Sequence, residues 1–258
     1  MLLNKAELSL AMNENWIFYP CQIEGKAASI LVDLDYVDSA PMPGFSTCIQ
    51  LRIKMKIARA DGLSSEEENE RLIEIDAAVE AGIDDRDDVK YVGRVTTDGI
   101  RDFFFYAKGD SSAENYVGPS LTEFNDYEFE SSKHHDHDWN SYLNFLNPSP
   151  RDLQVVANNE LIAELASNGD IHDAKRPIRH WLNFTSVATR SSAVTHAQAE
   201  KFKVINIHDG DGQFSMVIER LDQANFHAIN AVTLGLFDLA SSLDGKYDGW
   251  ESPIAKMQ

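Results

Sequence analysis

Apolar and polar positions alternate in several short runs in the first half of the chain. A period of two predicts strands that bury one face. We therefore predict strands at Trp16 to Ile23, Ala27 to Leu34, Thr47 to Ile57, Tyr91 to Val95 and Ile100 to Tyr106. The first three are expected to form a meander. The last two flank Asp98-Gly99, a dipeptide that supplies the positive φ angles of a tight hairpin.

Helical spacing occurs between and after these strands. Leu72, Ile75 and Val79 fall on one face of a helix. Three helices are expected in this half: one from Ser64 or Ser65 to Gly82, one over Ser111 to Asn125, and a short one capped by Asp138 and running to Leu146. The first half is therefore expected to be a mainly antiparallel sheet with helices.

The clearest boundary in the chain is Asn147-Pro148-Ser149-Pro150. Two prolines interrupt any regular element there, and Ser149 can cap a new helix with Pro150 at its first position. A chain of 258 residues is also long enough for two cores. We therefore expect an acidic α+β domain over 1–147 and a second domain over 148–258.

The second half changes from a helical to a strand period and back. Ile178, His180, Leu182 and Phe184 share one face of a predicted strand. The expected elements are a helix from Ser149 to about Ser167, a strand from Arg176 to Ser186, a short helix capped near Thr195, paired strands around Asp209-Gly210-Asp211-Gly212, a helix from Phe226 to Leu243 and an extended tail. From Arg176 onward this is the order of a ferredoxin-like α/β plait, so the fold class is α+β in two domains.

Charge narrows the range of partners. The net charge is −19, and residues up to Asn147 hold 13 basic and 28 acidic side chains, whereas the rest hold 10 and 14. A negative field repels nucleic acid and membrane surfaces and favours a basic protein segment. Met1 to Trp16 lacks the apolar core of an export signal, and Phe226 to Leu243 is too polar to span a membrane, so a cytoplasmic location is expected.

Candidate chemistry is sparse. His134, His135 and His137 form the one dense group of metal-capable side chains, which leaves open a metal-dependent enzyme as an alternative. Arg179 and Trp181 share a strand face and offer a second alternative, direct RNA binding. Nucleophile elbows, phosphate loops and metalloprotease motifs are absent from the sequence, so we expect no catalytic residues, no cofactor and no metal.

The two cysteines are too few for a disulfide framework. Cys21 and Cys48 could lie on neighbouring strands, but no Cys-x-x-Cys spacing marks a redox pair. We expect buried free thiols.

Two family resemblances cover most of the chain. The strand Arg179-His180-Trp181-Leu182-Asn183-Phe184 and above all Tyr247-Asp248-Gly249-Trp250-Glu251 resemble the regulator of ribonuclease activity B family. The segment Trp16-Ile17-Phe18-Tyr19 and the hairpin from Gly93 to Tyr106 resemble the domain of unknown function 695 family. The second resemblance brings no activity with it.

The first resemblance implies a ferredoxin-like domain that binds ribonuclease E and restrains its cleavage of RNA, without a cofactor or catalysis of its own. The function expected from it is a non-catalytic, protein-binding regulator of RNA turnover whose partner is a ribonuclease with a basic segment. The expected partner-binding residues are Tyr247, Asp248, Gly249, Trp250 and Glu251. For Tyr247 and Trp250, packing against the sheet is the competing role, and burial or exposure separates the two.

Overall fold

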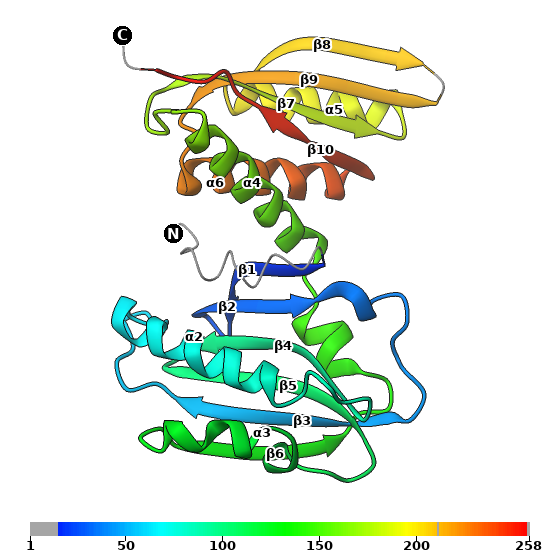
Figure 1. Cartoon of the computed structure of the whole chain (residues 1–258). Coiled ribbons are helices and arrows are strands. Elements are labelled where there is room, and N and C mark those ends of the chain that lie inside the picture. The colour runs from blue at the N-terminus through cyan, green and yellow to red at the C-terminus, as the bar shows by residue number, and fades with distance from the viewer. Residues whose placement is uncertain (1–14, 211, 257–258) are drawn as a thin grey trace. The chain divides into compact units, whose positions relative to one another are not determined.

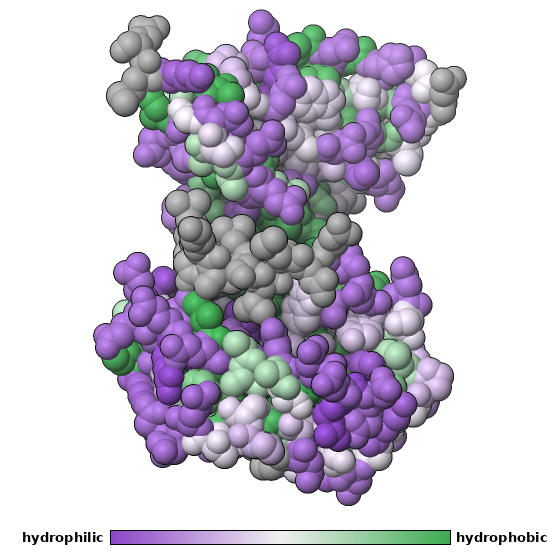
Figure 2. Space-filling model, viewed as in Figure 1, coloured by the Kyte–Doolittle hydropathy of each residue, from purple (hydrophilic) through white to green (hydrophobic). Residues whose placement is uncertain are grey.

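The computed structural model describes residues 15–210 and 212–256 and divides into two compact units, Met1–Asp152 and Leu153–Gln258. Each unit has one antiparallel sheet and its own helices, which confirms the predicted α+β class (Figure 1). The visible surface of both units is mainly hydrophilic (Figure 2). None of the described helices combines the length and the hydropathy that a transmembrane span requires. The segment predicted to lack an export signal is Met1 to Trp16, and its residues up to Glu14 lie outside the described ones.

Within residues 15–152, six strands form the sheet of the first unit in the order β1-β2-β4-β5-β3-β6, and all neighbours are antiparallel. Their bounds are β1 Trp16–Ile23, β2 Lys26–Asp33, β3 Phe45–Lys54, β4 Val89–Thr97, β5 Ile100–Lys108 and β6 Phe129–His135. The predicted meander of the first three strands was wrong, because the β4–β5 hairpin lies between β2 and β3.

Two tight turns of this sheet have left-handed backbone at their central residues. Asp98 and Gly99 have φ angles of 52° and 77°, and Glu24 and Gly25 have 51° and 79°. Positive φ at both central residues matches the right-handed twist of the flanking strands. The predicted hairpin at Asp98-Gly99 is therefore confirmed.

Helices cover both faces of this sheet. On one face, α2 (Glu66–Ala81) begins after Ser65, whose hydroxyl accepts a hydrogen bond from the Glu68 N–H. The predicted helix over Ser111 to Asn125 is instead two short pieces, α3 (Ala113–Val117) and η2 (Pro119–Phe124), because a proline cannot continue the first. The core on this face includes Leu72, Ile75, Val79, Ile49, Leu51, Phe103 and Phe105.

The other face is closed by η3 (Ser141–Leu146), with η1 (Leu34–Tyr36) after β2. The Tyr19 hydroxyl donates a 2.7 Å hydrogen bond to the Leu146 carbonyl, and the Tyr142 hydroxyl donates one of 2.6 Å to the Asp33 carbonyl. These buried bonds fix η3 to the first two strands.

The described residues of the second unit form a four-stranded antiparallel sheet in the order β10-β7-β9-β8. Its elements are α4 Pro150–Ser167, β7 Arg176–Phe184, α5 Val187–Ala199, β8 Lys203–Gly210, β9 Gln213–Asp222, α6 Phe226–Ser242 and β10 Gly245–Glu251. Counted from β7, the strand order is 4-1-3-2, which is the topology predicted for a ferredoxin-like plait. The predicted hairpin between β8 and β9 is present, although Asp211 in its turn lies outside the described residues.

One helix of this unit begins earlier than predicted, whereas the predicted extended tail is present as a strand. The helix expected to be capped near Thr195 begins after Ser186, whose hydroxyl accepts a hydrogen bond from the Thr189 N–H. Thr195 lies inside that helix and donates its hydroxyl to the Ser191 carbonyl one turn earlier. The extended tail is the edge strand β10, paired with β7.

Candidate functional site

The segment Tyr247–Glu251, predicted to bind a partner, forms most of strand β10. Tyr247 lies opposite Leu182 of β7 and Trp250 lies opposite His180. Residues three apart on a regular strand face opposite ways, but the register shifts at Asp248, between Tyr247 and Gly249. Both aromatic side chains therefore face the helices.

Tyr247 and Trp250 are part of the core. Their exposed fractions are 4% and 8%. The Tyr247 hydroxyl shares a 2.9 Å hydrogen bond with Nδ1 of His180, and the Trp250 indole N–H donates one of 2.9 Å to the Asn158 side-chain oxygen. The geometry favours the packing role for these two residues.

The buried polar groups beside them are structural. Asn158 donates to the Asn230 oxygen at 2.8 Å and to the Thr233 hydroxyl at 2.6 Å, which joins α4 to α6. Burial, with a smaller contribution from Arg220, lowers the pKa of His180 to about 3. His180 is therefore neutral near pH 7, in keeping with a core histidine.

The exposed face of this sheet lies on the side away from the helices (Figure 1). Arg179 and Trp181 share it, because they lie two residues apart on β7. The Arg179 guanidinium donates to Glu219 at 2.9 Å and to Glu251 at 3.4 Å. These two carboxylates offset the positive charge that an RNA phosphate needs, which disfavours the RNA-binding alternative. Asp248 is also exposed and lies 3.4 Å from the Lys246 amine.

The predicted histidine cluster is divided by the fold. His134 and His135 belong to the edge strand β6, and the rings of His135 and His137 stack 6.4 Å apart. Within the part of the chain that the structure describes, His134 is the one member of the three that joins other possible metal ligands, Cys48 and Asp136. The ligand atoms of these three residues all lie within 4.8 Å of one another. Cys48 was not predicted as a possible metal ligand, because the sequence alone does not show that β3 pairs with β6.

Asp136 caps the following helix in place of Asp138. Its carboxylate accepts hydrogen bonds from the N–H groups of Asn140 at 2.9 Å and Ser141 at 2.8 Å, and from the Tyr106 hydroxyl at 2.6 Å. Burial raises the pKa of this carboxyl, but the hydrogen bonds from Ser141, Tyr106 and Asn140 outweigh burial and lower it to about 2. The predicted cap at Asp138 was wrong, since η3 begins after Asn140 and the carboxylate that reaches its N–H groups is two residues earlier.

The two cysteines are free thiols, and Cys48 is buried whereas Cys21 is half-buried. Burial raises the pKa of Cys48 to about 11, with Asp136 adding to it and hydrogen bonds from Ser141 and Tyr106 opposing it. Burial also raises the pKa of Cys21 to about 11. Both thiols are therefore protonated near pH 7 unless a cation displaces the proton.

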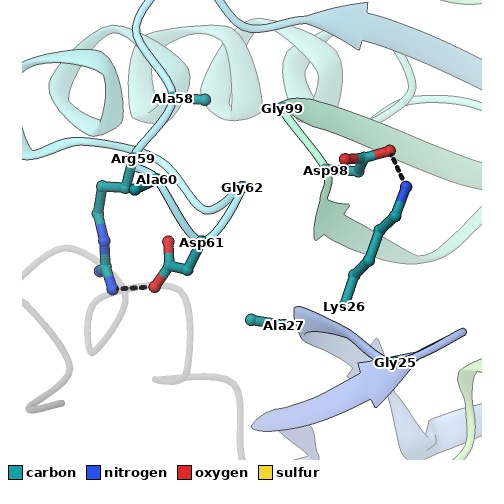
Figure 3. Close-up of a pocket in the computed structure, with 10 residues that line it drawn as sticks. All are labelled: Gly25, Lys26, Ala27, Ala58, Arg59, Ala60, Asp61, Gly62, Asp98 and Gly99. Atoms are coloured by element: carbon teal, nitrogen blue, oxygen red, sulfur yellow. Dashed lines mark hydrogen bonds and ion pairs between the residues drawn. The ribbon is translucent and has the colours of Figure 1, made fainter.

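A shallow cavity of about 480 Å³ lies among the turns at one end of the first sheet (Figure 3). It is bordered by two ion pairs, Lys26 with Asp98 and Arg59 with Asp61. Its walls are the β1–β2 turn, the β4–β5 turn and the loop after β3: Gly25, Lys26, Ala27, Ala58, Arg59, Ala60, Asp61, Gly62, Asp98 and Gly99. Among the described residues, this lining has no histidine, cysteine, serine or threonine, so these residues offer neither a nucleophile nor an imidazole base.

These features define a two-unit α+β protein whose second unit has a ferredoxin-like strand order. The chain belongs to the family of unknown function DUF695, whose model matches residues 14–147. Residues 156–252 match the model of the regulator of ribonuclease activity B family, as the sequence resemblance implied. The families found are thus a domain of unknown function and a regulator.

Comparisons with individual proteins add little. No curated protein matches the chain. A solved structure provisionally assigned as a glycine cleavage system transcriptional repressor aligns with 81% of this chain and 98% of its own, at 9% identity and a TM-score of 0.25. A score this low carries no argument about fold or function.

Proposed function

We propose that this protein is a non-catalytic regulator of RNA turnover that binds and inhibits a ribonuclease E-like enzyme in the cytoplasm. The observation that carries the proposal is the match of residues 156–252 to the regulator of ribonuclease activity B family. In this proposal residues 148–258 form the regulatory domain and residues 1–147 form an acidic domain of separate role.

The partner-binding role within Tyr247–Glu251 is proposed for its exposed members. Asp248 and Glu251 have side chains that are 48% and 58% exposed, on a strand at the edge of the sheet. Tyr247 and Trp250 support them from the core, and Gly249 with φ 115° allows the bulge that holds both aromatics inward. A basic segment of the ribonuclease would compete for these carboxylates with Lys246 and Arg179, each 3.4 Å away.

The test measures cleavage of a labelled RNA by a purified ribonuclease E-like endonuclease with increasing amounts of the full chain. We expect the chain to slow cleavage and to bind the nuclease less tightly at high ionic strength. The double variant Asp248→Asn/Glu251→Gln should weaken both effects. Glu160→Gln/Glu164→Gln removes the same charge from exposed positions of α4 and should not.

Two results would count against the proposal. If excess protein leaves RNA cleavage unchanged, the chain does not inhibit the nuclease. If the two double variants have equal effects, the β10 edge is not the binding site. Capture on the immobilised chain at low salt, followed by identification of the bound proteins, should recover a ribonuclease or its assembly.

A further inference from the structure

The first unit brings a thiol, an imidazole and a carboxylate together at one edge of its sheet. Cys48 of β3 lies directly opposite His134 of β6, and Asp136 follows the last residue of β6. Their ligand atoms all lie within 4.8 Å of one another. We propose that Cys48, His134 and Asp136 bind one zinc ion or a similar divalent transition metal, a role that is separate from ribonuclease regulation.

The donor set suits such an ion. Thiolate, imidazole and carboxylate are the three protein ligands of zinc, and three of them leave a fourth position for water. Nε2 of His134 lies 3.2 Å from the Ser141 hydroxyl, within the hydrogen-bonded group around Asp136. His134 is exposed and provides a route for the metal, whereas Cys48 has no exposed area.

The hydrogen bonds of Asp136 are compatible with ligation. Backbone N–H groups of Asn140 and Ser141 hold one carboxylate oxygen each, and metal-binding carboxylates are commonly oriented in this way. The Tyr106 hydroxyl donates to the oxygen that Ser141 also holds, so it is the donor with which a metal competes. On binding, the Cys48 thiol loses its proton to solvent and the thiolate sulfur becomes a ligand.

The position of the site suggests a structural role. Among the described strands, β6 lies at the edge of the sheet and pairs with β3 alone, and most of its residues are exposed. A metal held by residues of β3, β6 and the cap of η3 joins these three elements. Ligands that bind only the folded state raise its stability.

The sequence contains a matched control for each proposed ligand. Cys21→Ser is the control for Cys48→Ser, Asp138→Asn for Asp136→Asn, and His137→Ala for His134→Ala. The untagged full chain is loaded with Zn²⁺ and dialysed, its metal content is measured by elemental analysis, and Co²⁺ is titrated while thiolate-to-metal absorption is recorded.

We expect about one metal per chain, a thiolate-to-cobalt band, a higher unfolding temperature with Zn²⁺, and metal affinity at least about tenfold lower in each ligand variant but not in its control. A chain that retains no stoichiometric metal overturns the proposal. Metal affinity that is lost in His137→Ala but not in His134→Ala also overturns the proposal. If Asp136→Asn fails to fold, the exposed His134 decides the question, because its removal leaves the core intact.

Discussion

At the scale of residues, two buried arginines of the first unit face a single buried carboxylate. Arg94, Arg101 and Asp76 each have only 2% of their side chains exposed. Arg101 donates to Asp76 at 2.9 Å, whereas Arg94 lies at 3.3 Å from the same carboxylate without forming a hydrogen bond through its Nε or Nη1 atoms. One buried carboxylate thus faces two guanidinium groups, and the next acidic group on the same helix face is Glu80.

Glu80 should make stability depend on pH. Burial and the nearby Asp76 raise its pKa from 4.5 to about 7, with Arg94 opposing and Asp84 adding to the shift. Because the pKa of Glu80 is higher in the folded protein than in the unfolded chain, protonation of Glu80 favours the folded state. This contribution to the free energy of unfolding is complete below about pH 4.5 and is lost as pH rises toward 7. Glu80→Gln should therefore stabilise the protein more at pH 8 than at pH 5, by about 1 kcal/mol after allowance for partial solvation.

Urea unfolding of parent and variant at the two pH values measures this difference. Glu70→Gln removes an exposed carboxylate from the same helix and should show no such dependence. If Glu80→Gln changed the free energy of unfolding equally at both pH values, a raised pKa of Glu80 would be excluded as a source of pH-dependent stability.

At the scale of elements, the turns around the Figure 3 cavity depend on close backbone contact. The Gly62 carbonyl accepts a 2.8 Å hydrogen bond from the Gly99 N–H, and a Cβ at Gly62 would lie 2.8 Å from the backbone of Asp98. Gly25 has a similar φ angle, 79° against 83°, but a Cβ there would meet nothing within 4 Å. Substitutions at the two glycines therefore separate the cost of backbone strain from the cost of steric contact.

Alanine at these positions should have unequal costs. Gly25→Ala pays only the left-handed backbone strain, about 1–2 kcal/mol. Gly62→Ala adds the displacement of the β4–β5 turn, about 1–3 kcal/mol more. Equilibrium unfolding measures both, and equal losses would show that the contact between Gly62 and Asp98 relaxes freely.

Elements with strong local signals were predictable from sequence. The face of β7 that carries Ile178, His180, Leu182 and Phe184 is buried as its alternation predicted, and Ser65 caps α2. The strand β6 was missed because Phe129–His135 is polar along its length and forms a strand only by pairing with β3.

The candidate sites were harder to predict, because they depend on pairing and on local backbone irregularity. The bulge at Asp248 turns Tyr247 and Trp250 to the same side, which their spacing of three conceals. Cys48 and His134 are far apart in the chain and become neighbours only across two strands. Residue type indicated possible ligands, but tertiary pairing selected which of them meet.

At the scale of the whole molecule, acidity and the regulator family belong to different parts of the chain. Residues up to Asn147 carry a net charge of −15, from 13 basic and 28 acidic side chains, and those from Pro148 onward carry −4, from 10 and 14. Glu66, Glu67 and Glu70 are exposed near the start of α2, where the helix dipole favours negative charge. Long-range attraction of a basic partner and its retention at the β10 edge are thus separable properties.

Kinetics of nuclease binding should distinguish them. Replacing Glu66, Glu67 and Glu70 by glutamine weakens the field that attracts the partner, so the association rate at low salt should fall by up to about tenfold with little change in the dissociation rate. Asp248→Asn/Glu251→Gln should mainly accelerate dissociation, because those residues are proposed to contact the bound partner.

Biolayer interferometry at low and high ionic strength measures both rates. At high salt the α2 variant should match the parent, since screening removes the attraction that the substitution weakens. Faster dissociation in the α2 variant would instead place the acidic helix in direct contact with the nuclease.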